Sequence, residues 1–311
     1  MEHSLAIIIP AYRGRFLSQT LDSLAAQTNT NFKVYVGDDN STDDIKSIIE
    51  RYRDKLSIKY QKFSENFGAV NLAAHWKRCI DMSIGEEWIW ILPDDDMASP
   101  ECVHFFFAVE PKDKKVEKLY RFQTVHIDEH DKIIKSTPEC PLLESNTDFL
   151  IRKLRFERNS SVAEYIFSKK EFRAAGGFTS LPLAWGTDDL LWITLSSKYD
   201  IVTLPAGVVY LRQSRFNISN NRGLADEKFD AKYLFFKKLF SDKNFMNKAE
   251  REYGSAVLKR TISNHLFFEY RSYGINFLNK NLIRFAQKNN ELLGGGILKN
   301  IYRLLRYHFK K

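Results

Sequence analysis

Four short strand-like segments, separated by helical patterns, occupy the first hundred residues of this 311-residue chain. They cover residues 5–9, 32–37, 58–63 and 88–92. The first is continuously apolar and ends at Pro10, which is typical of a strand buried on both faces. Regular alternation of strand and helix predicts an α/β fold, with a mainly parallel sheet and right-handed crossovers under helices on both faces.

Polar residues follow three of these predicted strands. The segments are 10–13, 37–41 and 93–96. In open parallel sheets, ligands bind beyond the carboxyl ends of the strands. We therefore expect the functional site to be built from these three segments.

The later chain is less regular. Strands are predicted at 119–127, 162–167, 201–204 and 208–211, and helices at 171–175 and 190–197. After about residue 226 the pattern is mainly helical. We therefore expect an α/β domain over residues 1–220 and a helical region over 221–311.

The charge is distributed unevenly between these two parts. The whole chain carries a net charge of +8, but residues 207–311 carry +13 and residues 1–206 carry −5. A basic segment of this kind favours an anionic partner, either a nucleic acid or an anionic membrane. With 44% hydrophobic and 28% charged residues, the composition argues against a mainly disordered chain.

Three consecutive aspartates, Asp94, Asp95 and Asp96, follow the fourth predicted strand. Their mutual repulsion, together with burial, would be unfavourable unless a cation such as Mg²⁺ or Mn²⁺ were bound. The alternative is an acidic turn that caps the next helix. The sequence has neither of the two common glycine-rich phosphate loops, which favours a metal or basic side chains as the partner of a phosphate.

Four segments together resemble glycosyltransferase family 2 in their order and spacing. They are IIIPAY at 7–12, GDDNSTD at 37–43, ENFG at 65–68 and LPDDD at 92–96, followed by Pro100. The resemblance is specific over residues 4–105 and extends less tightly, through 176–178, 186–192 and 210–212, to about residue 220. It implies an inverting enzyme with the GT-A (Rossmann-like) fold in residues 1–220, of the type that builds bacterial cell-surface polysaccharide.

The resemblance also implies roles for residues on the nucleotide side. Those expected to contact or surround the nucleotide of a nucleotide-sugar donor are Pro10, Ala11, Tyr12, Asp38, Asp39, Asn66 and Gly68. Within this set, Asp39 would accept a hydrogen bond from the base, and Asp38 would shape the turn beside it.

For the diphosphate, the resemblance implies that Asp94 contacts the ribose and that Asp95 or Asp96 holds Mn²⁺ or Mg²⁺. The family usually has an aspartate where this chain has Pro93, so the choice between Asp95 and Asp96 stays open.

The catalytic base is implied to be Asp188, with Asp189 as its competitor. A carboxylate within reach of the acceptor hydroxyl can take its proton. The alternative is that either aspartate caps the helix that begins there. Trp185 is a candidate contact for the acceptor sugar, and Arg212 a candidate contact for phosphate or else a surface ion pair.

The last fifteen residues, 297–311, predict a basic amphipathic helix. Lys299, Arg303, Arg306 and Lys310 share one helical face, opposite an apolar face. Such a helix can lie on an anionic membrane, or it can pack on its own domain. Three widely spaced cysteines and the lack of a membrane-spanning run predict a cytoplasmic location, with contact to the inner face of the membrane through this segment.

The expected partners are a nucleotide-sugar donor and a saccharide or lipid-linked acceptor. The alternatives are a sugar nucleotidyltransferase, a retaining transferase, and a non-catalytic nucleotide-binding protein. A nucleic acid is not expected, because the acidic crevice would repel a phosphate backbone.

Overall fold

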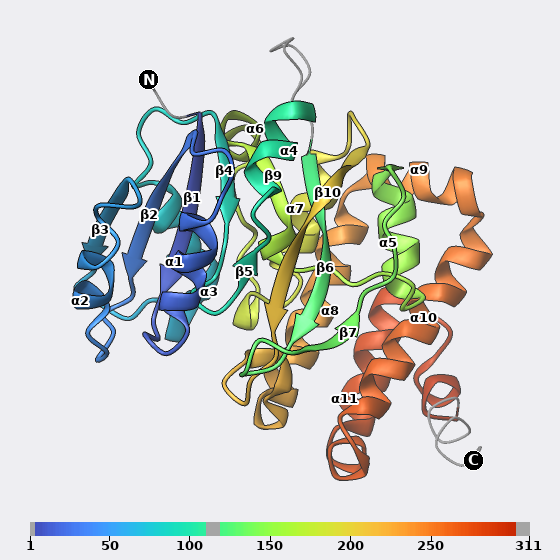
Figure 1. Cartoon of the computed structure of the whole chain (residues 1–311). Coiled ribbons are helices and arrows are strands. Elements are labelled where there is room, and N and C mark those ends of the chain that lie inside the picture. Colours follow the sequence, from blue (N-terminus) through green and yellow to red (C-terminus); the bar gives the residue numbers. More distant parts are fainter. Residues whose placement is uncertain (1–3, 110–118, 303–311) are drawn as a thin grey trace.

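The computed structural model describes residues 4–109 and 119–302. Its centre is a ten-stranded sheet flanked by helices (Figure 1). The strand order is β3-β2-β1-β4-β9-β6-β10-β5, with β7 beside β6 and β8 beside β10. The strands are β1 (Leu5–Ala11), β2 (Phe32–Asp38), β3 (Ile58–Lys62), β4 (Trp88–Ile91), β5 (Met97–Ala98), β6 (Leu119–Ile127), β7 (Ile133–Ser136), β8 (Leu143–Glu144), β9 (Tyr165–Ser168) and β10 (Ile201–Arg212).

The parallel arrangement predicted for the first four strands is confirmed. β3, β2, β1 and β4 pair in parallel. Beyond β4 the sheet is mixed, because β9 is antiparallel to both β4 and β6, whereas β6 and β10 pair in parallel. A strand direction depends on how the chain returns to the sheet, and the apolar pattern within a strand carries no information about it.

Helices cover both faces of the sheet. They are α1 (Leu17–Ala25), α2 (Ile45–Glu50), α3 (Gly68–Ile80), α4 (Cys102–Val109), α5 (Asn146–Leu154), α6 (Lys169–Ala174), α7 (Thr187–Leu195), α8 (Ala225–Ser241), α9 (Lys243–Tyr253), α10 (Ser255–Ser272) and α11 (Ile275–Leu293). β1 is completely buried over residues 5–9, with Ile7 and Ile9 facing the core under α1, α2 and α4. Ala6 and Ile8 face the other core, under α3, α5, α7 and the C-terminal helices.

One local prediction needs correction. The two strands predicted at 201–204 and 208–211 are one strand, β10, whose pairing with β6 shifts between Thr203 and Val208. Gly207 has a φ of 90° at this irregularity, which glycine adopts without a side-chain clash. The cap of α2 is Asp44, whose carboxylate accepts from the backbone N–H of Ser47.

The helical region after residue 225 confirms the predicted change of pattern. In Figure 1, α9, α10 and α11 lie beside α5, at the side of the sheet away from β3. Phe229 and Phe235 of α8 and Phe267 of α10 belong to the same hydrophobic core as Tyr165 of β9. The boundary at residue 220 stays a prediction, because this core continues across it.

The predicted tail helix lies partly outside the described residues. Residues 297–302 are helical, and Asn300 is buried, with its side-chain oxygen accepting a hydrogen bond from Asn289 at 2.8 Å. Arg303, Arg306 and Lys310 are outside the described part of the chain. Within that part, no helix combines the length and apolar character needed to cross a membrane.

Candidate active site

The turn after β4 brings three strand ends together. The Asp94 carboxylate accepts hydrogen bonds from the backbone N–H groups of Tyr12, at 2.7 Å, and Arg13, at 2.8 Å, in the loop after β1. The Asp96 carboxylate accepts from the backbone N–H of Arg212, at 2.9 Å, at the end of β10. The expectation that residues 10–13 and 93–96 meet is therefore confirmed.

The Arg212 side chain also binds this turn, through its backbone. It is 1% exposed, and its guanidinium donates to the carbonyl oxygens of Asp95 (2.9 Å) and Asp128 (2.8 Å). It also forms an ion pair with Asp131 at 2.6 Å. Arg212 is thus no surface group, and its bonds within the protein do not favour the predicted contact with phosphate.

Burial and crowding make this turn a place where positive charge is favourable. Burial and the neighbouring Asp95 charge raise the pKa of Asp94 to about 7 and the pKa of Asp96 well above its usual range. Burial raises the pKa of Asp95 to about 6, against the lowering effect of Arg212. A bound cation would stabilise the ionised carboxylates in place of protons.

These carboxylates fit a metal that is held jointly with substrate. In residues 4–109 and 119–302, no group of three or more His, Cys, Asp or Glu side chains is arranged to hold a metal ion. Asp95 is only partly buried, and together with Asp96 it offers part of a coordination shell. Mg²⁺ and related ions are commonly held by one or two carboxylates plus substrate phosphates and water. The donor set suits such an ion.

The Asp38 carboxylate holds the turn after β2. One oxygen accepts from the backbone N–H of Ser41 at 2.7 Å, and the other accepts from the Tyr60 hydroxyl at 2.8 Å. The Ser41 hydroxyl donates in turn to the carbonyl oxygen of Tyr12 at 2.5 Å. These bonds fix the turn after β2 against the loop after β1.

The Asp39 carboxylate is 2% exposed and has partners on both oxygens. It accepts from the backbone N–H groups of Phe67 (2.8 Å) and Gly68 (2.7 Å), and it pairs with the guanidinium of Arg78. The hydrogen bond from the base to Asp39 stays a prediction, and it would have to compete with these partners.

Gly68 is required at its position by close approach. A Cβ atom there would lie 2.5 Å from Asp39 Oδ2. Asn66 accepts from the backbone N–H of Ala69 at 3.0 Å and so helps to begin α3. The loop beside the predicted nucleotide site is therefore built around the Asp39 carboxylate.

Two residues of α3 were not among the predicted site residues. Arg78 lies over the rings of Phe63 and Phe67, at 3.9 and 4.7 Å from their centres. His75 Nδ1 lies 3.3 Å from Asp39, and burial lowers its pKa to about 4, so the ring is neutral near pH 7. Their helical spacing of three was the only available signal, and it is equally typical of an ordinary helix face.

Pro10, Ala11 and Tyr12 differ in exposure. Ala11 is buried, and its carbonyl oxygen accepts from the backbone N–H of Asp39 at 2.8 Å. Pro10 is half-buried within β1, and Tyr12 is 42% exposed. The Tyr12 side chain is thus available to a ligand beside the carboxylate turn.

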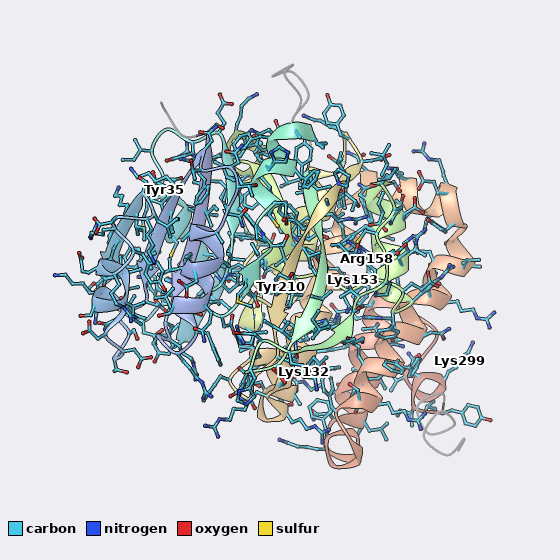
Figure 2. All side chains as sticks on the ribbon, viewed as in Figure 1. Tyr35, Lys132, Lys153, Arg158, Tyr210 and Lys299 are labelled. Carbon is cyan, nitrogen blue, oxygen red and sulfur yellow. The ribbon has the colours of Figure 1, made fainter. Side chains whose placement is uncertain are left out.

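Asp188 and Asp189 occupy the first turn of α7 but have different surroundings. The helix is capped by Gly186 without a side-chain bond, so neither aspartate is the cap. Asp189 is buried and pairs with Lys153 of α5, a residue labelled in Figure 2. Asp188 is half-buried and has no ion pair within the described part of the chain. Burial and the Asp189 charge raise the pKa of Asp188 to about 7.

The segment before α7 is conformationally unusual. Leu183 and Ala184, in the short 3-10 helix η2 (Pro182–Ala184), have φ values of 56° and 51°. Such left-handed non-glycine residues are costly and occur often at functional sites. η2 packs against α3 and α8. This packing connects the start of α7 with the helix that begins beside Asp39.

Trp185 follows η2 and is half-buried. The ammonium group of Lys228 lies 4.9 Å from the centre of its ring. The same ammonium donates to the carbonyl oxygens of Ser219 and Asn221, at 2.9 and 3.0 Å. The contact of Trp185 with acceptor sugar stays a prediction, and the ring already has a partner within the protein.

Comparison with known proteins agrees with the motifs. Residues 6–108 match the family model for glycosyl transferase family 2. Over 67 residues, 21% of this chain and 16% of the relative, the sequence is 43% identical to validoxylamine A glucosyltransferase of Streptomyces hygroscopicus subsp. jinggangensis. Over 216 residues, 60% of this chain and 22% of the relative, it is 31% identical to the hyaluronan synthase of Pasteurella multocida.

A solved structure resembles nearly the whole chain. Residues 1–349 of Staphylococcus aureus TarS, in complex with UDP-GlcNAc, match with a TM-score of 0.59 and 16% sequence identity, over 98% of this chain and 91% of that chain. This likeness shows the GT-A fold. The chain spans less than a fifth of the length of the first curated relatives it matches. Residues 6–108 therefore carry the sequence of the glycosyltransferase family 2 model, and the relatives and the fold agree with that match.

Proposed function

We propose that this chain is an inverting glycosyltransferase that moves a sugar from a nucleotide-diphosphate donor to a hydroxyl group of an acceptor. The observation that carries this proposal is the turn of Asp94, Asp95 and Asp96, held between the loop after β1 and the end of β10. It places crowded carboxylates at the edge of a parallel sheet, where ligands of such sheets bind.

Asp95, with Asp96 beside it, would hold Mn²⁺ or Mg²⁺ on the diphosphate. When bound, such an ion acts as a Lewis acid that offsets charge on the leaving diphosphate. Asp94 would face the ribose, and Tyr12 and the loop of Asn66 and Gly68 would surround the nucleotide.

Asp188 is the proposed base. As the acceptor oxygen bonds to C1 of the sugar, its proton passes to the Asp188 carboxylate, while the bond from C1 to the diphosphate breaks on the opposite face. Attack opposite the leaving group inverts the anomeric centre. Asp188 suits this role better than Asp189, because Asp189 is already paired with Lys153.

We propose that the product belongs to a surface polysaccharide or glycolipid. Support comes from the relatives, which include a poly(ribitol-phosphate) β-N-acetylglucosaminyltransferase of Staphylococcus aureus and the hyaluronan synthase. The solved TarS complex contains UDP-GlcNAc, so UDP-sugars are the donors to test first.

The cytoplasmic location and contact with the inner face of the membrane belong to the same proposal. The location rests on the widely spaced cysteines, and the membrane contact rests on the basic amphipathic pattern of residues 297–311. Deleting these residues should abolish co-sedimentation with vesicles that contain phosphatidylglycerol. If the intact protein does not co-sediment with them, the membrane contact is ruled out and the transferase proposal is unaffected.

A panel of nucleotides tests the central proposal. A ligand that binds the native state raises the unfolding temperature. We expect a rise with UDP or another nucleoside diphosphate that requires Mn²⁺ and is lost in Asp95→Ala. Incubation with UDP-sugars and NMR of the product would then show the inverted anomer. A rise limited to nucleoside triphosphates would favour a sugar nucleotidyltransferase, and a retained anomer would overturn the inverting assignment.

A further inference from the structure

Three exposed arginines surround one exposed aromatic ring beside the carboxylate turn. The guanidinium carbons of Arg13, Arg215 and Arg15 lie 4.5, 4.9 and 5.5 Å from the centre of the Phe216 ring, which is 37% exposed. Arg13 and Arg15 come from the loop after β1, and Arg215 and Phe216 follow β10. We call these four residues the Phe216 cluster.

One of the three arginines of this cluster has an ion pair, and the charge of Arg13 also favours the ionised forms of Asp94 and Asp95. Arg15 forms an ion pair with Glu129 at 2.6 Å. Neither Arg13 nor Arg215 has an ion pair in residues 4–109 and 119–302. Guanidinium groups tolerate this proximity because the face of an aromatic ring attracts cations, and arginine is weakly hydrated. The arrangement holds two unpaired cations close together and open to solvent.

The cluster adjoins the proposed reaction site through both of its segments. The backbone N–H of Arg13 donates to Asp94, and Arg212, three residues before Arg215, donates to Asp96 and to the carbonyl oxygen of Asp95. Arg212 itself lies over Phe16, 4.4 Å from the ring centre. An anion bound at the cluster would thus lie beside the carboxylate turn.

The donor diphosphate already has a proposed partner. That partner is the divalent cation at Asp95, which would be the main contact of the diphosphate oxygens. Arg13 and Arg215 would then remain as unpaired cations that face solvent, which suits bidentate recognition of further phosphate or carboxylate groups. The remaining substrate of a transferase is its acceptor.

We infer that the Phe216 cluster binds negatively charged groups of the acceptor, so that the acceptor is an anionic polymer or glycolipid and not a neutral sugar. This inference rests on the proposed transferase function. Arg13 and Arg215 supply the contacts with the oxyanion, and both they and Arg15 lie against the Phe216 ring.

Direct binding tests the inference without requiring activity. The probes are fluorescein-labelled polyphosphate, oligogalacturonate as a polycarboxylate, and maltoheptaose as a neutral oligosaccharide, without added metal. We expect the native protein to bind at least one anionic probe and not maltoheptaose. The double variant Arg13→Gln/Arg215→Gln should weaken anion binding about tenfold, through the loss of two solvent-exposed ion pairs with the probe. Phe216→Leu, which keeps every charge, should give a smaller loss.

Arg173→Gln is the matched control. Arg173 is an exposed arginine in α6. In Figure 1, α6 lies at the opposite end of the strands from the loop after β10. The Arg173→Gln variant should bind each anionic probe as the native protein does. An equal loss in this control would mean that binding reflects overall positive charge, and it would overturn the inference.

A second readout separates acceptor from donor. The Mn²⁺-dependent unfolding-temperature rise with UDP should be the same in the double variant as in the native protein. A parallel loss of UDP binding would assign the cluster to the donor diphosphate and overturn the acceptor assignment. If the native protein binds anions but no nucleotide, the transferase proposal fails while the anion site stands; unchanged anion binding in the double variant removes the site.

Discussion

The parallel strands β3, β2, β1 and β4 and the mixed strands β9, β6 and β10 supply different kinds of groups to the proposed site. In the parallel block, the residues sit where strands end, and their carboxylates accept backbone N–H groups from the adjacent loops. Beyond β4, the proposed base sits at the start of a helix after a left-handed turn. The comparison suggests that the first block binds the donor and that the second part supplies the reacting group.

The largest expected effect is at Asp95. Asp95→Ala should reduce turnover by about a thousandfold, because the charge that develops on the leaving diphosphate is no longer offset. It should also abolish the Mn²⁺-dependent part of nucleotide binding, measured by calorimetry with UDP. A variant that keeps metal-dependent binding would transfer the metal role to Asp96, and Asp96→Ala should then show the loss.

A second test shows which of Asp188 and Asp189 is the catalytic base. Asp188→Asn should lower kcat by about 10²–10⁴-fold, the usual contribution of a general base, with donor affinity unchanged. Asp189→Asn leaves Lys153 without its ionised partner, so it should mainly lower the unfolding temperature. The reverse result, with kcat lost only in Asp189→Asn, would make Asp189 the base. Loss of donor binding in either variant would contradict the assignment of donor binding to the parallel strands alone.

Gly68→Ala should give a moderate effect confined to the donor side. The added Cβ would lie 2.5 Å from Asp39 Oδ2, so the start of α3 must shift. Overpacking of this kind costs about 1–3 kcal/mol of unfolding free energy. Urea unfolding measures this cost, and UDP affinity should fall with it. Gly85→Ala, where nothing lies within 4 Å of the added Cβ, is the control, and equal losses in both would contradict the close-packing argument.

The smallest expected effect is a shift in pH dependence. Asp188 must be ionised to accept a proton, and its pKa of about 7 predicts that kcat rises with pH through this value. In Asp189→Asn, a neighbouring negative charge is removed, so the pKa of Asp188 should fall and the rise should move to lower pH. A shift to higher pH would show that Asp188 is not the titrating group.

The raised pKa of Asp188 also makes the free energy of unfolding depend on pH, with higher stability at lower pH. A carboxyl whose pKa is higher in the folded state contributes stability below its unfolded value, near 4, and this contribution is lost as pH rises through about 7. Asp188→Asn should therefore reduce the difference in unfolding free energy between pH 5 and pH 8. Urea titrations at the two pH values measure this difference, and an increase would contradict the cause assigned to the shift.

The donor side was predictable because strand ends combine two strong signals. A continuous apolar run locates β1, and polar residues that follow it and β4 must then share one edge of the sheet. What sequence could not provide was the partner of each carboxylate. The pairing of Asp39 with Arg78 depends on how α3 packs, and the pairing of Asp189 with Lys153 joins two helices whose contact no local pattern encodes.

The acceptor side was less predictable for a related reason. Short strands such as β9 show no periodicity that fixes their direction, and β10 combined two predicted strands across an irregularity. The Phe216 cluster was not predicted from the sequence. Arg13 and Arg215 lie about 200 residues apart and meet only when β10 reaches the turn after β4.

The hydrogen bond from Arg212 to Asp96 joins residues 116 positions apart in sequence. It can form only after both residues have been synthesised. Contacts between distant residues form late, because the entropy of closing the loop must be met first, and chains fold progressively as they leave the ribosome. The segment with the family motifs leaves the ribosome early. The carboxylate turn lacks its hydrogen bond from Arg212 until residue 212 has been synthesised. A nascent chain should therefore complete the proposed nucleotide site only in a late step, after residue 212 has been translated.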